Sequence, residues 1–132
     1  MRPSASFDAL RGFAREGTVS VRVRGDCMVP FLADGSQVEV AAARLYWPGD
    51  VVVWSAPEGG LVAHRLLGYR LHRGALALVT RGDSAAVHDS PVPLSRVLGR
   101  VSGAGVSLSA RGAAVRAFLG IALARLVRGR PR

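Results

Sequence analysis

The side chains in this sequence that could perform nucleophilic chemistry are one cysteine and a few polar residues. Cys27 is the only cysteine and lies in the stretch VRVRGDCMVPFLADG, two residues after Gly25. A structural cysteine usually lies inside an apolar run, whereas this thiol follows an alternating strand pattern at a predicted turn. A thiol nucleophile needs a base that removes its proton, and the base needs a group that orients it.

His64 is a candidate for that base. It is one of three histidines and lies within the predicted strand LVAHRLLGYRL, where a core position is the ordinary alternative. The loop TRGDSAAVHDSPV, residues 80–92, follows another predicted strand and contains Asp83, His88 and Asp89. A solvated polar turn would explain the loop equally well, so the residue types alone leave both interpretations open.

Short alternating segments predict the elements that must position these groups. Strands are expected over residues 18–23, 37–43, 51–56, 61–71, 75–80 and 96–103, separated by turn sequences such as WPGD and PEGG. Phe7, Leu10 and Phe13 predict an amphipathic helix over 4–16 that ends near Gly17. The sequence therefore predicts a mainly β fold in a single domain, residues 1–132, with a core over 18–103 and a helix at each end.

The C-terminal segment predicts a helix over residues 110–128. Its apolar residues Val115, Phe118, Leu119, Ala122 and Leu126 fall on one stripe, and arginines follow at the end. This stripe could pack on the β core or on a partner helix. It could also lie on the surface of an anionic bilayer.

The charge is strongly basic, at +9, and all eighteen basic residues are arginine. Such a balance favours an anionic partner or a simply soluble, solvated surface. Nucleic acid is the weakest candidate partner, because no basic stripe is interleaved with aromatic residues. Neither a secretory signal nor a membrane-spanning run is found, so we expect a cytoplasmic protein, or one peripheral to the inner face of the membrane. A lysine base is excluded because the chain has no lysine.

Five segments together resemble the signal-peptidase and LexA-like peptidase superfamily. VRGDCMVPFLADG is similar to its nucleophile box, in which a serine lies between Gly-x and Met-x-Pro. PGDVVVW, LVAHRLLG, TRGDSAAVHDSPV and VLGRV then follow in the order that the superfamily has. The resemblance covers residues 19–101 and implies a coiled β-sheet fold, a pseudo-barrel, that cuts peptide bonds without a cofactor or metal.

Carried over to this sequence, the resemblance places the nucleophile at Cys27 and the base at His64, immediately before Arg65. The better match is the archaeal, sporulation and endoplasmic-reticulum type of signal peptidase, which has a histidine where other members have a lysine. Asp83 and Asp89 lie at the positions of that type's acids. We prefer Asp89 as the residue that orients His64, with Asp83 as the second choice; spacing alone does not choose between them.

The resemblance also suggests the residues that would contact a peptide or protein substrate. Gly25 permits a tight turn, and Asp26, Met28 and Pro30 flank the thiol. The backbone N–H of Cys27 would meet the oxyanion. Met28, Pro30 and the following Phe31 could form the apolar edge of a substrate groove, or could simply pack at the turn.

Two functions follow as expectations. The first is a leader- or signal-peptidase-like endopeptidase with a Cys27 and His64 dyad. The second is a pseudo-peptidase that holds an extended peptide without cutting it, because cysteine replaces the superfamily's serine. Cys27 could be a working nucleophile, an impaired one or a deliberate substitution.

Overall fold

The computed structural model describes residues 5–25, 28, 32, 34–102 and 108–128. The elements are, in chain order, α1 (Ala5–Glu16), β1 (Val19–Arg22), β2 (Gln37–Ala41), β3 (Val51–Ser55), β4 (Leu61–His72), β5 (Ala75–Arg81), β6 (Val92–Pro93), the 3-10 turn η1 (Leu94–Arg96), β7 (Val97–Val101) and α2 (Leu108–Arg128). The prediction of a mainly β chain with a helix near each end is confirmed. The short β6 and η1 were not predicted.

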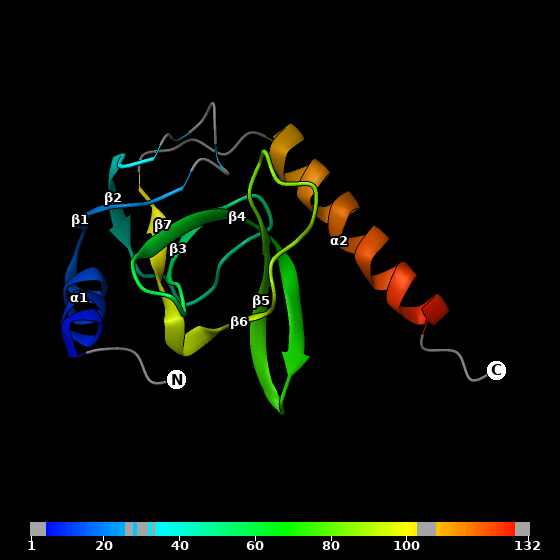
Figure 1. The fold of residues 1–132 in the computed structure, drawn as a ribbon, viewed down its shortest axis with the longest axis horizontal. Helices are drawn as coiled ribbons and strands as arrows, with labels where there is room; N and C mark the ends of the chain where they lie inside the picture. The colour runs from blue at the N-terminus through cyan, green and yellow to red at the C-terminus, as the bar shows by residue number, and fades with distance from the viewer. Residues whose placement is uncertain (1–4, 26–27, 29–31, 33, 103–107, 129–132) are drawn as a thin grey trace.

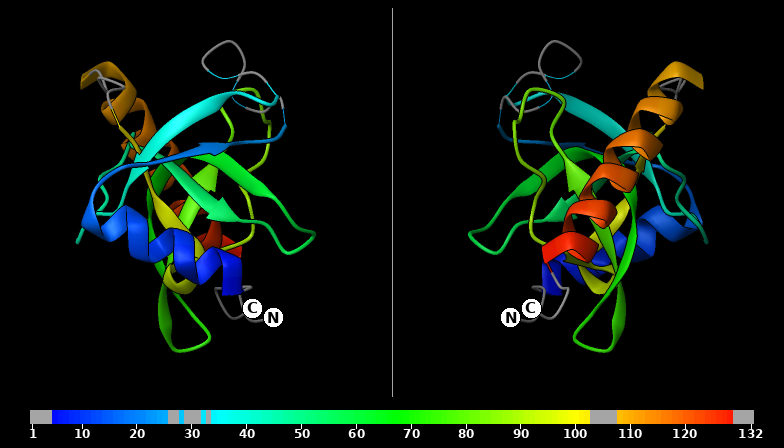
Figure 2. Two further views of the ribbon diagram at one scale, coloured as in Figure 1. Left: turned by 90° about the vertical axis from the view of Figure 1, so that its left-hand side faces the viewer. Right: turned by 90° about the vertical axis from the view of Figure 1, so that its right-hand side faces the viewer.

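The seven strands form one antiparallel sheet in the order β1-β2-β7-β3-β4-β5-β6. The sheet curls into a half-barrel, with α1 and α2 on opposite sides of it (Figures 1 and 2). β4 is the longest strand and joins two halves of the sheet, because it pairs with β3 near its start and with β5 further along. A register shift between Leu66 and Gly68 marks a bulge in β4, which bends the strand.

Both faces of the central strands are buried. Along β3, Val51 and Val53 belong to the core cluster that includes α1, whereas Val52 and Trp54 belong to a second cluster on the other face. This explains why β3 is a continuous apolar run rather than an alternating one. β4 also carries buried side chains on both faces, which gives His64 a rigid support.

Helix α1 packs on the sheet through residues seven apart. Phe7 and Ala14 are buried and Leu10 is partly buried, but Phe13 is 61% exposed. The predicted placement of Phe13 on the packed stripe is therefore wrong. The carbonyl of Ala14 accepts a hydrogen bond from the Ala42 N–H at 3.0 Å. The end of α1 therefore lies close to the segment after β2, and the small side chain of Ala14 leaves room for this approach.

Helix α2 packs across β4 and β5 through a face different from the predicted one. Ala114, Ala117, Phe118 and Ile121 pack against Leu67 and Val79. Phe118 approaches the backbone so closely that a Cβ at Gly68 would lie 2.5 Å from its ring. Of the predicted stripe, Phe118 packs and Ala122 is partly buried, whereas three residues face solvent: Val115, Leu119 and Leu126.

The reason is that α2 is apolar on two faces. Leu108 and Leu123 extend the exposed apolar stripe on its outer side. A sequence pattern alone does not tell which of two apolar faces meets the sheet. Within the described ranges, no helix combines the length and apolarity that crossing a membrane requires.

Candidate active site

His64 lies in β4, opposite Val52 of β3, with 8% of its surface exposed. The ring of Trp54 meets the imidazole edge to face, with 5.8 Å between ring centroids. This packing restricts the rotation of the imidazole. The sequence left open whether His64 is a core residue or a catalytic base. Its burial in the core is part of what fixes the orientation of its ring.

Asp89 binds the imidazole of His64. The Nδ1 atom of His64 lies 2.5 Å from Oδ2 of Asp89. Because an ionised carboxylate only accepts hydrogen bonds, Nδ1 carries the proton, and the neutral ring then has its lone pair on Nε2. Nε2 has no hydrogen-bond partner in the part of the chain that the structure describes.

Thr80, at the end of β5, fixes the carboxylate that orients His64. Its hydroxyl donates to Oδ2 of Asp89 at 2.7 Å, and its carbonyl accepts from the Asp89 N–H at 2.8 Å. The side chain and the backbone of Asp89 are thus both tied to β5. Thr80 is fully buried, and no sequence pattern pointed to it.

Asp83 has a different partner. Both of its carboxylate oxygens accept hydrogen bonds from Arg65, from Nε and Nη2, each at 2.8 Å. Nη1 of Arg65 donates to the carbonyl of Gly49, also at 2.8 Å. The hydrogen bonds that Arg65 donates to Asp83 raise the pKa of Arg65 above its ordinary value, despite an opposing contribution from burial. The structure therefore brings Asp89, not Asp83, to His64.

Met28 connects the Cys27 segment to the acidic loop. Its side chain is buried, and its sulfur accepts a hydrogen bond from the Asp83 N–H at 3.3 Å. Gly25 adopts a φ of +94°, and its N–H donates to the Asp34 carboxylate at 2.7 Å. The left-handed φ explains the glycine at this turn.

Three predicted site residues, Asp26, Cys27 and Pro30, lie outside the described residues, as does Phe31. Their proposed roles stay predictions. His88, the neighbour of Asp89, is exposed and lines a cavity beside α2 rather than contacting His64.

Asp50 is a buried acid that was not among the predicted site residues. It is 3% exposed and accepts a hydrogen bond from the Trp47 N–H at 2.9 Å. Its carboxylate also lies 3.2 Å from Arg111 of α2 and 3.5 Å from Arg100 of β7. These contacts give Asp50 a structural role in holding α2 to the sheet. Its position in the turn sequence PGD was the available signal.

Among the described residues, no group of three or more His, Cys, Asp or Glu side chains could hold a metal ion. The site that the structure does show is a buried imidazole held in one orientation by a carboxylate. In comparisons with known proteins, no protein-family model and no curated protein matched this chain.

Proposed function

We propose that this chain is a peptidase of the signal-peptidase and LexA-like type, with Cys27 as nucleophile, His64 as base and Asp89 as the orienting residue. The observation that carries the proposal is the 2.5 Å contact between His64 and Asp89. Any buried imidazole N–H needs an acceptor, but a carboxylate acceptor also selects the tautomer and stabilises the imidazolium, as a catalytic base requires. The anchoring of Met28 beside Asp83 adds support, since Cys27 precedes Met28 in the sequence.

The proposed reaction is acyl transfer through a thioester. Nε2 of His64 takes the thiol proton, and the thiolate of Cys27 attacks the carbonyl carbon of the peptide bond. When the tetrahedral intermediate collapses, the C–N bond breaks and the imidazolium returns the proton to the leaving amine. Water, deprotonated by His64, then hydrolyses the thioester and releases the free thiol. Asp89 stays ionised and stabilises the imidazolium at each proton transfer.

The position of β1 supports an extended peptide as the substrate. β1 lies at one end of the strand order, and in the described part of the chain no strand pairs with its outer side. The sequence runs from the end of β1 at Arg22 to Cys27 in five residues. A peptide added as a strand along β1 would therefore run toward the nucleophile segment.

The alkylation rate of Cys27 by iodoacetamide, measured against pH, tests the proposed dyad. We expect reactivity to extend well below the ordinary thiol pKa of about 8.5 and this extension to disappear in His64→Ala. His88→Gln is the matched control, because His88 is an exposed histidine in the same loop as Asp89. Ordinary titration near a pH of about 8.5 in both the original chain and His64→Ala would contradict the dyad and favour the peptide-holding alternative.

The outer face of α2 favours a second role, contact with an anionic bilayer. Leu108, Val115, Leu119, Leu123 and Leu126 are all more than 40% exposed there. Exposed Trp47 and the arginines 111 and 116 line a hollow at the start of this face. α2 contains no acidic residue, so its charge is complementary to acidic lipid headgroups. We propose that this face binds the surface of such a membrane.

A further inference from the structure

A cavity of about 670 Å³ lies between α2 and the strands β4 and β5, and Asp89 is among the residues that line it. No local sequence pattern indicates it, because its walls come from four separate segments: β4, β5, the loop that follows β5, and α2. Val79, Pro91, Phe118 and Ile121 supply apolar surface. A volume of this size matches the cavities that hold small organic ligands in proteins.

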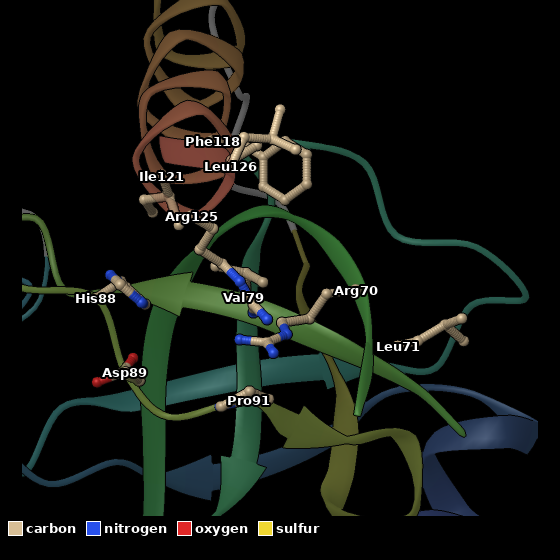
Figure 3. Close-up of a pocket in the computed structure, with 11 residues that line it drawn as sticks. Arg70, Leu71, Val79, His88, Asp89, Pro91, Phe118, Ile121, Arg125 and Leu126 are labelled. Atoms are coloured by element: carbon tan, nitrogen blue, oxygen red, sulfur yellow. The ribbon is translucent and has the colours of Figure 1, made fainter. Parts of the chain in front are cut away.

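Two arginines enter this cavity from opposite walls. Arg70 comes from β4 and Arg125 from α2, and both side chains extend toward Val79 (Figure 3). His88 contributes a further polar group at the edge of the cavity. Guanidinium groups stay protonated at any physiological pH, so two positive charges share one partly apolar space.

Neither arginine has an acidic partner within the described ranges. No ion pair or side-chain hydrogen bond involves Arg70 or Arg125 there, and the buried Nε–H of Arg70 has no acceptor. Asp89 is the acidic residue that lines the cavity, but its Oδ2 already receives His64 and Thr80. A buried donor without an acceptor is costly, and a bound anion would satisfy it.

We propose that this cavity binds a small amphipathic anion. A carboxylate or phosphate group would lie between Arg70 and Arg125, and an apolar chain or ring would contact Val79, Phe118 and Ile121. The ligand needs both a charged head and an apolar body, because the arginines supply only hydrogen-bond donors and the remaining walls of the cavity are largely apolar. A free fatty acid and an acidic phospholipid share this chemistry.

The fluorescent anion 1-anilinonaphthalene-8-sulfonate, titrated into the full chain, tests the site. We expect saturable binding that weakens at least tenfold in Arg70→Met and in Arg125→Met. Arg70→Lys and Arg125→Lys keep the charge and should bind within about threefold of the original chain. Arg44→Met and Leu76→Gln are matched controls at exposed positions outside the cavity and outside the outer face of α2, and should bind unchanged.

Competition then defines the ligand. Decanoate is expected to displace the probe, whereas acetate and decanol at the same concentration are not, because one lacks the apolar body and the other the charge. Dihexanoyl phosphatidate separates the two sources: stronger displacement by this lipid assigns an acidic phospholipid, and stronger displacement by decanoate assigns a fatty acid. Displacement by neither lipid, equal displacement by acetate or decanol, or unchanged binding in Arg70→Met and Arg125→Met would overturn the proposal.

The binding test does not depend on peptidase activity. Asp89 belongs both to the cavity and to the contact with His64, so a bound anion is also expected to change the alkylation rate of Cys27 if the proposed dyad operates. Failure of the dyad would abolish that effect and leave the probe titration intact. Failure of the anion site would leave the alkylation profile intact.

Discussion

The imidazole of His64 and the carboxylate of Asp89 are in hydrogen-bond contact although they are 25 residues apart in the sequence. β4 and β5 form the antiparallel pair that makes this contact possible, because Leu66 of β4 faces Thr80 of β5. The loop after β5 then returns Asp89 to the carbonyl of Thr80. The geometry of the candidate base is therefore a property of the strand pairing, reinforced by one buried threonine.

Removing the Thr80 hydroxyl should loosen Asp89. Thr80→Val keeps the shape of the side chain but removes the donor to Oδ2 of Asp89, so we expect a loss of about 1 kcal/mol in the free energy of unfolding. We also expect slower alkylation of Cys27 near neutral pH, because His64 would be oriented less firmly. Urea unfolding and the alkylation assay measure the two effects. Thr18→Val, at an exposed position, is the control and should change stability by less than about 0.5 kcal/mol.

The outcome that would contradict this role is a Thr80→Val variant with normal stability and normal alkylation. Loss of stability alone would assign Thr80 to the fold rather than to the orientation of His64. Asp89→Asn distinguishes these cases further, since it should reduce alkylation and make the Thr80→Val change nearly silent for that readout.

The pair of Arg65 and Asp83 should stabilise the fold without activating Cys27. Arg65→Lys loses the two-pronged contact with Asp83 and the bond to the Gly49 carbonyl, so we expect a loss of about 1 to 3 kcal/mol in unfolding free energy. Arg24→Lys is the matched control, because its pair with Glu58 is exposed and should contribute less than about 1 kcal/mol. Equal losses in the two variants would show that the less exposed pair of Arg65 and Asp83 has no greater strength than the exposed one.

Asp83→Asn tests the division of roles between the two acids. The variant should lose stability as Arg65→Lys does, while the pH profile of Cys27 alkylation stays the same. A profile that moves as much in Asp83→Asn as in Asp89→Asn would contradict the assignment of Asp89 as the sole orienting residue.

The sequence predicted the mainly β architecture because its strands follow short-range patterns. The resemblance pointed to both Asp83 and Asp89, with Asp89 preferred, and the described geometry places Asp89 in contact with His64. Thr80 was missed because its hydroxyl acts across a loop whose return path no local pattern encodes. Phe13 was misplaced because the tight contact at Ala14 depends on how closely α1 approaches the sheet. The cavity of Arg70 and Arg125 combines distant segments, so it was not predictable either.

Alkaline pH should weaken the packing of Tyr69 against Tyr46. The Tyr69 hydroxyl donates to the Tyr46 carbonyl at 2.5 Å and accepts from the Tyr46 N–H at 2.9 Å. Burial is the main reason that the pKa of Tyr69 is raised above its ordinary value of 10.0. The unfolded chain therefore loses this proton at lower pH than the folded chain does. The stabilisation is complete below about pH 10 and is lost as the pH rises through the raised pKa.

Urea unfolding of the original chain and of Tyr69→Phe, from about pH 8 to about pH 11, measures this effect on both sides of the ordinary tyrosine pKa. At the lower pH the variant should be less stable by about 1 kcal/mol, because the carbonyl of Tyr46 loses its donor. Above about pH 10 the difference should shrink, since the phenylalanine variant has no phenolic proton to lose. A difference that stays constant over the whole range would mean that the Tyr69 proton does not contribute to the fold.

The outer face of α2 should bind acidic membranes through both charge and apolar surface. We expect the chain to float with vesicles that contain phosphatidylglycerol, but not with vesicles of phosphatidylcholine alone. Leu119→Gln and Leu123→Gln together should reduce the floating fraction at least fivefold, because both side chains are more than half exposed on this face. Leu76→Gln, an exposed leucine on β5, is the matched control. Raising the salt concentration should weaken the contact by screening the arginines. If the double variant still floats, the membrane contact lies elsewhere on the molecule. If the original chain does not float, this face does not bind membranes, and contact with a partner protein becomes the favoured role.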